Sequence, residues 1–446
     1  MVEFMIVGAD AAGLSAAIQV KRKRPDASIK VINKGKTISY GACGIPYVLS
    51  GDIESVEKLI HFTPQSFKEK RGIPVEISRE ATDIFPEEHE IEIKNLETGA
   101  QYMEKYKKLL LGTGAVAKEL PFLDYTQDGI YNVHDLEDLR EILAFLEKKK
   151  PQKAAIIGAG NIGLEIAEAL HTLGKEILLF EILEAPVANW PAIVQEAVQK
   201  KIQEKGIQFF GKMCIKEVKR EKEAFSIRTE RQEFKAGVIF TAVGIRPATD
   251  FCGNKIKKMK NGALLIDQRA QTSEKDIYAA GDCASVFNKV LRRNVYSPLG
   301  STANKLGRIA GLNMTGEKIK FPGIAGTQIF KFFELSLAKT GLSLEEAQQE
   351  GIEAEAFSAR RTDRAGYYPG AKKVQVEIVC EKKSEKIIGT SVVGEGNAAQ
   401  FVDPAAVAVL SEMPIEDLAW FDAAYTPPYA PVWNALVSAG FKAAKL

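Results

Sequence analysis

The sequence predicts an α/β protein with two parallel sheets and a separate α+β domain at its C-terminal end. Two similar segments predict the sheets, because each has an apolar strand, a glycine-rich turn, a helix and a second apolar strand. Beyond about residue 321 this pattern gives way to alternating strands such as residues 374–379. We therefore expect two units of one design followed by a third unit of another.

The first unit opens the chain. Its expected strands are Val2–Val7 and Ile29–Ile32, and the turn Gly8–Gly13 leads into the helix between them. Glycines in such a turn let a pyrophosphate approach the positive end of a helix, which is the Rossmann fingerprint for dinucleotides. Asp10 stands where the second glycine belongs and Asn33 where the acidic residue belongs. This copy could therefore also be a turn that serves packing alone.

The second unit matches the fingerprint in full. The strand Ala154–Ile157 precedes the turn Gly158–Gly163, a helix runs to about Leu173, and the strand Ile177–Phe180 ends at Glu181. A carboxylate at the last position accepts hydrogen bonds from the adenosine ribose and disfavours a 2′-phosphate. The sequence therefore predicts a dinucleotide site that disfavours a 2′-phosphate.

With 446 residues, the chain is long enough for about three domains. Its 60 Lys and Arg residues nearly balance 58 Asp and Glu residues, which leaves a formal charge of +2 and excludes nucleic-acid binding by bulk positive charge. No segment approaches the ~20 apolar residues that span a bilayer, and no leader pattern precedes the opening strand. We expect a soluble, cytoplasmic protein without nucleic-acid or membrane partners.

The five cysteines are widely spaced along the chain. No two of them form a CxxC redox pair, and the four histidines are scattered, so we expect no metal site. At most one cysteine is expected to be functional, the others being small packing residues. The five are Cys43, Cys214, Cys252, Cys283 and Cys380.

Four further motifs occur in a fixed order: Ser39–Tyr47, Ile277–Ala284, Gly366–Gly370 and Ala424–Trp433. With these motifs and the two glycine turns, the chain resembles the flavoprotein disulfide reductases that have two dinucleotide folds. Within that superfamily it is similar to the single-cysteine branch of coenzyme A disulfide reductases, NAD(P)H sulfur or persulfide reductases and NADH oxidases. The resemblance covers nearly the whole chain.

The resemblance implies an FAD-binding domain, an NAD(P)H-binding domain and a dimerisation domain. We expect them at residues 1–115 with 244–320, at 116–243 and at 321–446 respectively. In the first domain Asp282 would hold the ribityl chain of FAD, and in the second Glu165 would lie near the nicotinamide ring. The chain would form a homodimer. Asn161 departs from the family, which commonly has an aromatic residue at this position.

The expected cofactor-binding residues come from both glycine turns and from the strand ends beside them. They are Gly8, Ala11, Ala12, Gly13, Asn33, Lys34, Ala81, Thr113, Gly114, Asp282, Ala303, Gly158, Gly160, Asn161, Ile162, Gly163, Glu165, Glu181 and Gly244.

Cys43 is the expected redox residue. Pro46 favours the first turn of a helix, so Cys43 would lie just before a helix N-terminus, whose positive end lowers a thiol pKa. Gly41 and Gly44 would let the sulfur approach a flat ring. The thiolate would attack a sulfur–sulfur bond and form a mixed disulfide or take up a persulfide sulfur. Because no resolving cysteine is nearby, the flavin or a second thiol would have to regenerate it.

A coenzyme A channel is implied beside the first helix, where Ser15, Gln19 and Arg22 share one face. The alternative is a solvated helix end. The other expected substrate residues are Ser39, Ala42, Arg71, Asn304, Arg308 and Trp433. At Ala42 the family often has asparagine, which weakens the assignment of the substrate but not that of the chemistry.

Of three tyrosines near the C-terminus, Tyr367 or Tyr368 is expected to reach the active site of the partner subunit together with Tyr425. A phenol there would hydrogen-bond the reactive sulfur or protonate a leaving thiolate. The alternative is that they only pack a dimer interface, where tyrosine is common.

Three functions compete. The first is NADH- or NADPH-dependent reduction of coenzyme A disulfide, coenzyme A persulfide or polysulfide, with FAD and Cys43. The second is an NADH oxidase or peroxidase, with Cys43 cycling through sulfenic acid. Enzymes of that kind usually carry a histidine in the first glycine turn, where this chain has Ala11, so the first function is favoured. The third is a non-enzymatic flavoprotein, which the intact motif at Cys43 disfavours.

Overall fold

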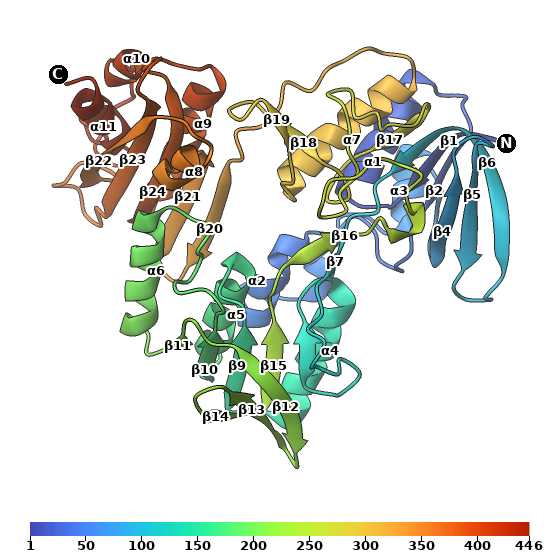
Figure 1. Ribbon diagram of the computed structural model, residues 1–446, viewed down its shortest axis with the longest axis horizontal. Coiled ribbons are helices and arrows are strands. Elements are labelled where there is room, and N and C mark those ends of the chain that lie inside the picture. The colour runs from blue at the N-terminus through green and yellow to red at the C-terminus, as the bar shows by residue number, and fades with distance from the viewer. Residues whose placement is uncertain (446) are drawn as a thin grey trace.

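The chain folds into three lobes, each built on its own sheet (Figure 1). The computed structural model describes residues 1–445. The predicted class is confirmed, because two lobes contain parallel α/β sheets and the third is an antiparallel sheet with helices. No helix among residues 1–445 is long and apolar enough to cross a membrane.

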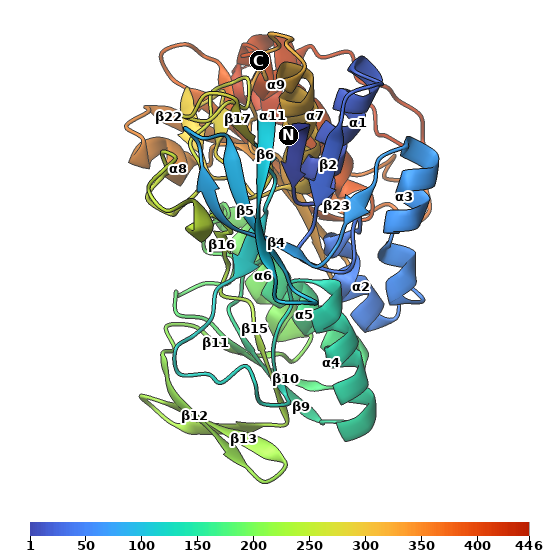
Figure 2. The ribbon, with the colours of Figure 1, turned by 90° about the vertical axis from the view of Figure 1, so that its right-hand side faces the viewer.

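The first lobe has a parallel sheet in the order β3-β2-β1-β6, with β17 on the free side of β6. The first half of β6 turns away and pairs with β5 in the antiparallel ribbon β4-β5-β6, which faces the viewer in Figure 2. Both strands predicted for this unit are confirmed. The strands are β1 (Val2–Val7), β2 (Ile29–Ile32), β3 (Val75–Glu76), β4 (Arg79–Phe85), β5 (Glu90–Asn95), β6 (Gln101–Leu111) and β17 (Ile277–Ala279), with the small hairpin β18 (Val286–Asn288) and β19 (Arg293–Val295) beside them. The helices are α1 (Ala11–Lys23), α2 (Ile45–Ser50), α3 (Pro64–Arg71) and α7 (Gly300–Met314).

Helices α1 and α7 pack backbone to backbone. A Cβ atom placed on Gly307 would lie 2.2 Å from the carbonyl oxygen of Ala12, and one placed on Gly311 would lie 2.5 Å from that of Ala16. The two glycines are one turn apart, as are the two alanines, so small residues face each other along the contact. This close approach places the surface side chains of α1 and α7 on one continuous face.

Replacing Gly307 by alanine is expected to lower the free energy of unfolding by about 2 kcal/mol, because the added methyl group meets backbone that has no room to move. Urea unfolding followed by circular dichroism measures the change. Gly300→Ala is the matched control, since Gly300 lies on the same helix and a Cβ atom there would have nothing within 4 Å. Equal stability of the two variants would contradict the packing described here.

The second lobe has a five-stranded parallel sheet in the order β11-β10-β9-β15-β8 and a three-stranded antiparallel meander. The two-stranded ribbon of β7 and β16 lies where the chain leaves the first lobe and returns to it. The strands are β7 (Ala115–Ala117), β8 (Ile130–Asn132), β9 (Lys153–Ile157), β10 (Glu176–Phe180), β11 (Gln208–Phe210), β12 (Ile215–Glu221), β13 (Ala224–Thr229), β14 (Glu233–Ala236), β15 (Val238–Thr241) and β16 (Ile245–Pro247). The helices are α4 (Leu136–Lys149), α5 (Asn161–Thr172) and α6 (Ala192–Glu204).

The third lobe is an antiparallel sheet in the order β20-β21-β24-β23-β22. Apolar side chains of α9 and α11 cover one face of it. On the other face, the hairpin β20–β21 reaches the second lobe, where Phe330 packs on Trp190 with ring centroids 4.8 Å apart. The elements are β20 (Gln328–Phe332), β21 (Leu335–Gly341), β22 (Ala354–Thr362), β23 (Lys373–Glu381), β24 (Ile387–Glu395), α8 (Leu344–Gln349), α9 (Val402–Leu410), α10 (Ile415–Ala419) and α11 (Ala435–Ala443).

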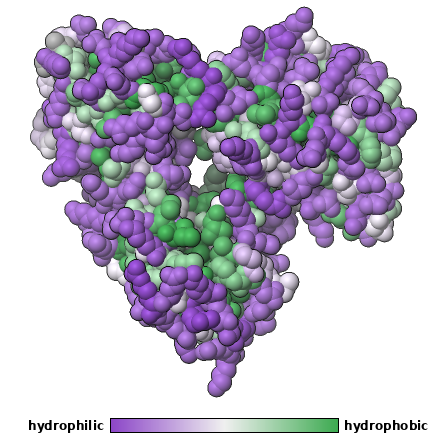
Figure 3. Space-filling view, viewed as in Figure 1, coloured by the Kyte–Doolittle hydropathy of each residue, from purple (hydrophilic) through white to green (hydrophobic). Residues whose placement is uncertain are grey.

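The three lobes surround a hollow, and apolar side chains gather at its floor on the second lobe (Figure 3). One buried apolar cluster joins α2 of the first lobe, α4 and α5 of the second, and the hairpin β20–β21 of the third. The lobes are therefore held together at the place where the cysteine motif before α2 lies.

Candidate active site

The two glycine turns have the same internal geometry. A Cβ on Gly8 would lie 2.0 Å from a carbonyl oxygen of the neighbouring strand end, and one on Gly158 would lie 2.4 Å from the equivalent oxygen. In each turn the last glycine, Gly13 or Gly163, would place a Cβ within 2 Å of the first glycine's carbonyl oxygen. The glycines thus bring helix and strand into contact, as the fingerprint requires.

Asn33 and Glu181 also occupy equivalent places. The amide of Ala9 donates to Asn33 Oδ1 at 3.0 Å, and the amide of Ala159 donates to Glu181 Oε2 at 2.8 Å. The side-chain nitrogen of Asn33, Nδ2, donates to two backbone carbonyls of the loop that follows, at 3.0 and 3.1 Å. Asn33 and Glu181 therefore both bind their glycine turn, and only Glu181 has a carboxylate there.

Two carboxylates face the first glycine turn. Asp10 is the N-cap of α1, and its side chain makes no capping hydrogen bond to the helix. Burial, with a further contribution from Asp282, raises the pKa of Asp10 to about 6, while His61 opposes the shift. Burial also raises the pKa of Asp282, which lies just beyond the end of β17 at Ala279.

An unpartnered tyrosine hydroxyl and several small residues give the first lobe features that fit FAD. The hydroxyl of Tyr296 is buried without a hydrogen-bond partner, and burial, with a further contribution from Asp282, raises the pKa of this phenol. Gly114 has open space around it, and a Cβ on Gly281 would lie 3.1 Å from Ala12 and 3.6 Å from Ala303. These residues suit a ligand that passes close to the small residues and has hydroxyl groups that can hydrogen-bond Asp282 and Tyr296.

The other expected cofactor residues of the first lobe lie around the same edge. Thr113 follows β6 and donates through Oγ1 to the carbonyl of Ala248 at 2.7 Å. At the far end, Lys34 pairs with Glu80 at 2.8 Å, next to Ala81 in β4. Ala11 and Ala12 form the first turn of α1.

In the second lobe, the expected nucleotide residues surround the carboxyl ends of β9 and β15. Gly160 is the N-cap of α5, and a Cβ atom on it would have nothing within 4 Å, as is also true of Gly244. Asn161 begins the helix, and the side chain of Ile162 is 43% exposed. An open edge of this kind is where dinucleotides bind in open parallel sheets.

Cys43 lies in a 3-10 turn, Ala42–Gly44, that leads into α2, and its side chain is exposed. Helix α2 packs on α5 of the second lobe, as both ribbon views show. Across this contact Tyr47 donates to Glu165 Oε1 at 3.4 Å. The structure thus joins the cysteine motif of the first lobe to the nucleotide helix of the second.

The expectation that a helix end lowers the pKa of Cys43 is wrong for the protein alone. Desolvation by the surrounding protein raises this pKa, and the carboxylates of Glu165 and Asp282 raise it further. Helix α2 has only six residues, so its dipole is weak beside two facing carboxylates. Burial likewise raises the pKa of Glu165, to about 7.

Of the other cysteines, Cys252, Cys283 and Cys380 are buried and Cys214 is partly exposed. Cys283 lies within hydrogen-bonding distance of the Leu111 carbonyl, 3.2 Å away. These positions agree with packing roles for the buried three.

The expected substrate residues of α1 and α7 share a surface. Ser15 donates to Asn304 Oδ1 at 2.8 Å across the helix contact. Arg22, Arg71 and Arg308 are exposed, and within residues 1–445 none of the three guanidinium groups pairs with a carboxylate. The end of α3 approaches α1, because a Cβ on Gly72 would lie 3.6 Å from the Lys21 side chain.

Three other expected substrate residues, Gln19, Ser39 and Trp433, are not part of this exposed surface of α1 and α7. Gln19 is only 7% exposed, so its side chain belongs to the interior more than to the surface. Ser39 donates its amide to the carbonyl of Ala9 at 3.0 Å and has a φ of 50°. Trp433 lies in the third lobe, where its ring packs on Phe441 with centroids 5.5 Å apart.

The tyrosine motifs come together in the third lobe. The hydroxyls of Tyr367 and Tyr425 are 3.0 Å apart, and the amide of Ala365 donates to the carbonyl of Pro427 at 3.1 Å. Tyr367 is 76% exposed and Tyr425 is 48% exposed. Their shared hydrogen bond raises the pKa of Tyr367.

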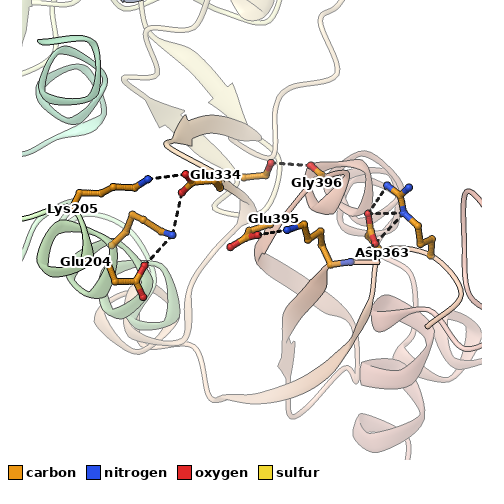
Figure 4. A network of polar contacts seen from close by, with 10 residues as sticks. Glu204, Lys205, Glu334, Asp363, Glu395 and Gly396 are labelled. Carbon is orange, nitrogen blue, oxygen red and sulfur yellow. Dashed lines mark hydrogen bonds and ion pairs between the residues drawn. The ribbon is translucent and has the colours of Figure 1, made fainter. Parts of the chain in front are cut away.

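A polar network holds both ends of the loop of residues 363–372, which contains Tyr367 and is called the tyrosine loop below (Figure 4). The buried carboxylate of Asp363 accepts from the amide of Lys372 at 2.8 Å and from the guanidinium of Arg364. Lys372 also pairs with Glu395 on β24 at 3.1 Å. The loop between residues 363 and 372 is therefore tied to the sheet at both ends.

The third lobe exposes a set of large apolar side chains between residues 407 and 433. Large exposed apolar patches mark interaction surfaces. Its members are Val407, Trp420, Phe421, Tyr425, Tyr429, Val432 and Trp433, of which Val407, Trp420 and Tyr429 are more than 60% exposed.

Four residues near the site have no role assigned from the sequence: Tyr47, Glu168, Tyr296 and Lys331. Tyr47 lies inside the cysteine motif, so proximity in sequence could have indicated it. Lys331 pairs with Glu168. In the sequence it is one of the exposed residues that alternate with buried ones along β20, and such a lysine gives no sign of a functional role. Only the fold brings Lys331 to the site.

Comparison with known families agrees with this geometry. Residues 2–303 match the pyridine nucleotide-disulphide oxidoreductase family model. Residues 327–436 match the dimerisation domain of pyridine nucleotide-disulphide oxidoreductases. The two matches cover all three lobes.

Individual relatives extend over the whole chain. An NAD(P)H sulfur oxidoreductase (CoA-dependent) of Pyrococcus furiosus is 32% identical and is aligned over 97% of both chains. An NADH oxidase of Methanocaldococcus jannaschii is 29% identical, with 99% of this chain and 98% of the relative covered. The structure of an NAD-dependent persulfide reductase from A. fulgidus has a TM-score of 0.95 and 31% identity, and the match covers 100% of this chain and 83% of that one.

Proposed function

The chain belongs to the pyridine nucleotide-disulphide oxidoreductase family, and we propose that it uses NADH to reduce a sulfur–sulfur bond at Cys43. The proposed acceptors are coenzyme A disulfide, coenzyme A persulfide and polysulfide. The observation that carries this proposal is the position of Cys43, an exposed thiol at the contact between α2 and the nucleotide helix α5. The relatives that act on sulfur compounds support the class of substrate.

The first glycine turn, Asp282 and Tyr296 would hold FAD, and the second turn with Glu181 would hold the nicotinamide nucleotide. Bound FAD would take a hydride from the reduced nucleotide and deliver an electron pair to sulfur. The protein's own part is to hold Cys43 between the two nucleotide sites. Packing of α2 on α5 fixes that position.

The sulfur chemistry needs one thiol. The thiolate of Cys43 attacks one sulfur of coenzyme A disulfide, so a Cys43–coenzyme A mixed disulfide forms and a coenzyme A thiolate leaves. Two electrons then break the mixed disulfide, which releases the second coenzyme A thiolate and restores the Cys43 thiolate. Protons complete the two product thiols. With coenzyme A persulfide, the Cys43 thiolate takes up the outer sulfur as coenzyme A thiolate leaves, and two electrons then break the Cys43 persulfide, which releases sulfide and restores the Cys43 thiolate.

The surface of α1, α3 and α7 would hold the nucleotide part of coenzyme A. Arg22, Arg71 and Arg308 have no carboxylate partner within residues 1–445, and guanidinium groups bind phosphates in bidentate fashion. Ser15 and Asn304 lie on the same helix pair. Polar and cationic groups thus line a surface that suits a phosphate-rich thiol.

We propose that the enzyme is a homodimer in which the tyrosine loop and Trp433 serve the active site of the partner subunit. The match to a dimerisation domain and the exposed aromatic surface of the third lobe support this arrangement. Within one chain, Tyr367 and Tyr425 bond to each other on a lobe other than that of Cys43.

Oxygen reduction is the second candidate function, because one relative is an NADH oxidase. In this chain α5 begins with Asn161, where the family commonly has an aromatic residue. Against this function, the first turn has Ala11 and no histidine. In an oxidase or peroxidase of this kind, Cys43 would cycle through sulfenic acid.

A panel of acceptors tests the proposed function. Anaerobic NADH oxidation by the FAD-loaded enzyme is measured with coenzyme A disulfide, coenzyme A persulfide and polysulfide in turn. We expect rapid turnover with at least one of the three. Slow turnover with all three, together with rapid NADH oxidation in air, would favour the oxidase.

The enzyme is expected to prefer NADH over NADPH by about 10²-fold in kcat/KM, because the Glu181 carboxylate repels a 2′-phosphate. Glu181→Gln removes this charge and should narrow the ratio. Glu184→Gln is the control, since Glu184 pairs with Lys212 at 2.9 Å and is not bound to the turn. An unchanged ratio in Glu181→Gln would exclude Glu181 as the determinant.

A further inference from the structure

A buried lysine of the third lobe contacts the second lobe. Lys339 lies on β21, and its side chain is only 9% exposed. Its Nζ donates to the carbonyl of Asn189 at 2.8 Å and lies 5.2 Å from the centre of the Trp190 ring. The carboxylate of Glu346 on α8 lies 3.6 Å away. Because burying an ammonium group is costly unless it is bonded, these contacts account for a lysine at this position.

The contacts of this lysine hold a loop that starts at the expected ribose carboxylate. The loop, residues 182–191, joins Glu181 to α6. At its start, the amide of Leu183 donates to Glu181 Oε1 at 3.0 Å. Near its end, the buried ring of Trp190 packs on Phe330 of β20. Glu181 therefore holds the start of the loop, and the third lobe holds its end.

The middle of the loop binds the second glycine turn. The amide of Val187 donates to the carbonyl of Ala159 at 2.8 Å, and the amide of Ala159 donates to Glu181 Oε2 at 2.8 Å. Both backbone groups of Ala159 are thus bound, one by the loop and the other by the carboxylate before it. The amide of Trp190 donates to the carbonyl of Val187 at 2.7 Å. This bond connects the residue in contact with the glycine turn to the residue that the third lobe holds.

The backbone of Val187 indicates that these contacts keep the loop in a strained conformation. Its φ is 44°, which lies in the left-handed region that β-branched residues rarely adopt. Such a conformation persists only where the surrounding structure fixes it. Loss of an anchor at the end of the loop should therefore release Val187 and weaken its bond to Ala159.

We propose that Lys339 is a positioning residue for the nicotinamide nucleotide, because it holds the 182–191 loop against Glu181 and the second glycine turn. Lys339 acts through the loop and not by contact with the nucleotide. The inference rests on the proposed nucleotide site of the second lobe. It goes beyond that site because it gives the third lobe a part in binding the reductant within its own subunit.

Hydrogen–deuterium exchange of the oxidised, FAD-loaded protein measures the loop without turnover. Lys339→Met keeps a side chain of similar length but removes the donor to the Asn189 carbonyl. Peptides that cover residues 182–191 should exchange about fivefold faster than in the wild type, which corresponds to the loss of one hydrogen bond.

Calorimetric titration of the same protein with NAD⁺ measures the nucleotide site. We expect a Kd that is about fivefold higher in Lys339→Met than in the wild type. The limiting rate of flavin reduction at saturating NADH, followed by anaerobic stopped-flow absorbance, should stay within about twofold. A change confined to Kd separates positioning of the nucleotide from a general loss of structure. Because the titration needs no sulfur acceptor, its outcome is separate from that of the acceptor panel.

Lys205→Met is the matched control. Lys205 pairs with Glu334 of the hairpin β20–β21 at 2.7 Å, as Figure 4 shows, so it also joins the second lobe to the third. Its replacement weakens a contact between the same two lobes but keeps Lys339 on the loop, so the exchange of the loop and the Kd should stay at wild-type values. A wild-type Kd in Lys339→Met, or an equal rise in Lys205→Met, would overturn the proposal.

A second variant, Lys339→Ala, covers a failure of Lys339→Met to fold. Methionine would place an apolar group against the Asn189 carbonyl, whereas alanine leaves room for a water molecule beside it. The same rise in the Kd for NAD⁺ is expected, because alanine also removes the donor. A Kd for NAD⁺ equal to that of the wild type in Lys339→Ala would contradict the proposed role.

Discussion

Replacing Cys43 by serine is expected to reduce anaerobic NADH turnover with sulfur acceptors by about 10³-fold or more, because serine cannot form the mixed disulfide. Cys43 is the exposed thiol of the chain, and a serine in its place keeps the size of the side chain. FAD content and reduction of the flavin by NADH should stay normal, because no expected cofactor residue is changed. Stopped-flow absorbance separates flavin reduction from turnover.

The control for this variant is Cys214→Ser. Cys214 is partly exposed, and it lies in the second lobe just before β12. Its replacement should leave turnover within about twofold of the wild type, as is usual for surface substitutions away from a site. Retention of full sulfur reductase activity by Cys43→Ser would exclude the single-thiol mechanism.

Removal of the two bonded phenols is expected to lower kcat by about 10²-fold, the usual contribution of a positioned proton donor. The variant is Tyr367→Phe with Tyr425→Phe, which keeps both rings for packing. Tyr429→Phe is the control, because Tyr429 is 70% exposed in the same segment. If the phenols only pack an interface, the double variant should retain activity.

Mixed dimers show which subunit supplies the tyrosines. Co-expression pairs a Cys43→Ser chain with a chain that lacks both phenols. If the tyrosines act across the interface, one of the two sites in each heterodimer has both Cys43 and wild-type phenols, and the isolated heterodimer should have about half of the wild-type activity. If they act within their own chain, neither site is complete and activity stays low.

The sequence predicts best the elements that repeat a strong local pattern. The predicted strands Val2–Val7 and Ile29–Ile32 have the same bounds in the structure. The strand expected at residues 374–379 lies within Lys373–Glu381. Helix α1 begins at Ala11, directly after Asp10, because Asp10 takes the N-cap position that ends the turn.

The electrostatics of Cys43 could not be predicted from its own motif. The motif indicates a helix end, and the helix is present. The opposing carboxylates come from α5 and from the end of β17, which are far from residue 43 in the sequence. A pKa depends on the summed burial and charge around a group, so it follows only from the fold.

Gln19 and Lys331 also could not be placed from local sequence alone: the pattern misplaced Gln19, and it gave no indication of Lys331. Helical spacing places Gln19 on one face with Ser15 and Arg22, but α7 packs closely on this helix and Gln19 is buried. Lys331 has no local signal, and it reaches the site because the hairpin β20–β21 packs against α5. Tertiary contacts decide both cases.

The most direct test of the central claim is the mass of the Cys43 peptide after the NADH-free enzyme meets coenzyme A disulfide under anaerobic conditions. We predict one coenzyme A adduct per chain on Cys43, with one equivalent of coenzyme A thiol released. Addition of NADH should remove the adduct and release a second equivalent. An enzyme that turns over coenzyme A disulfide without any adduct at Cys43, or one whose adduct persists after NADH is added, would contradict the single-thiol account.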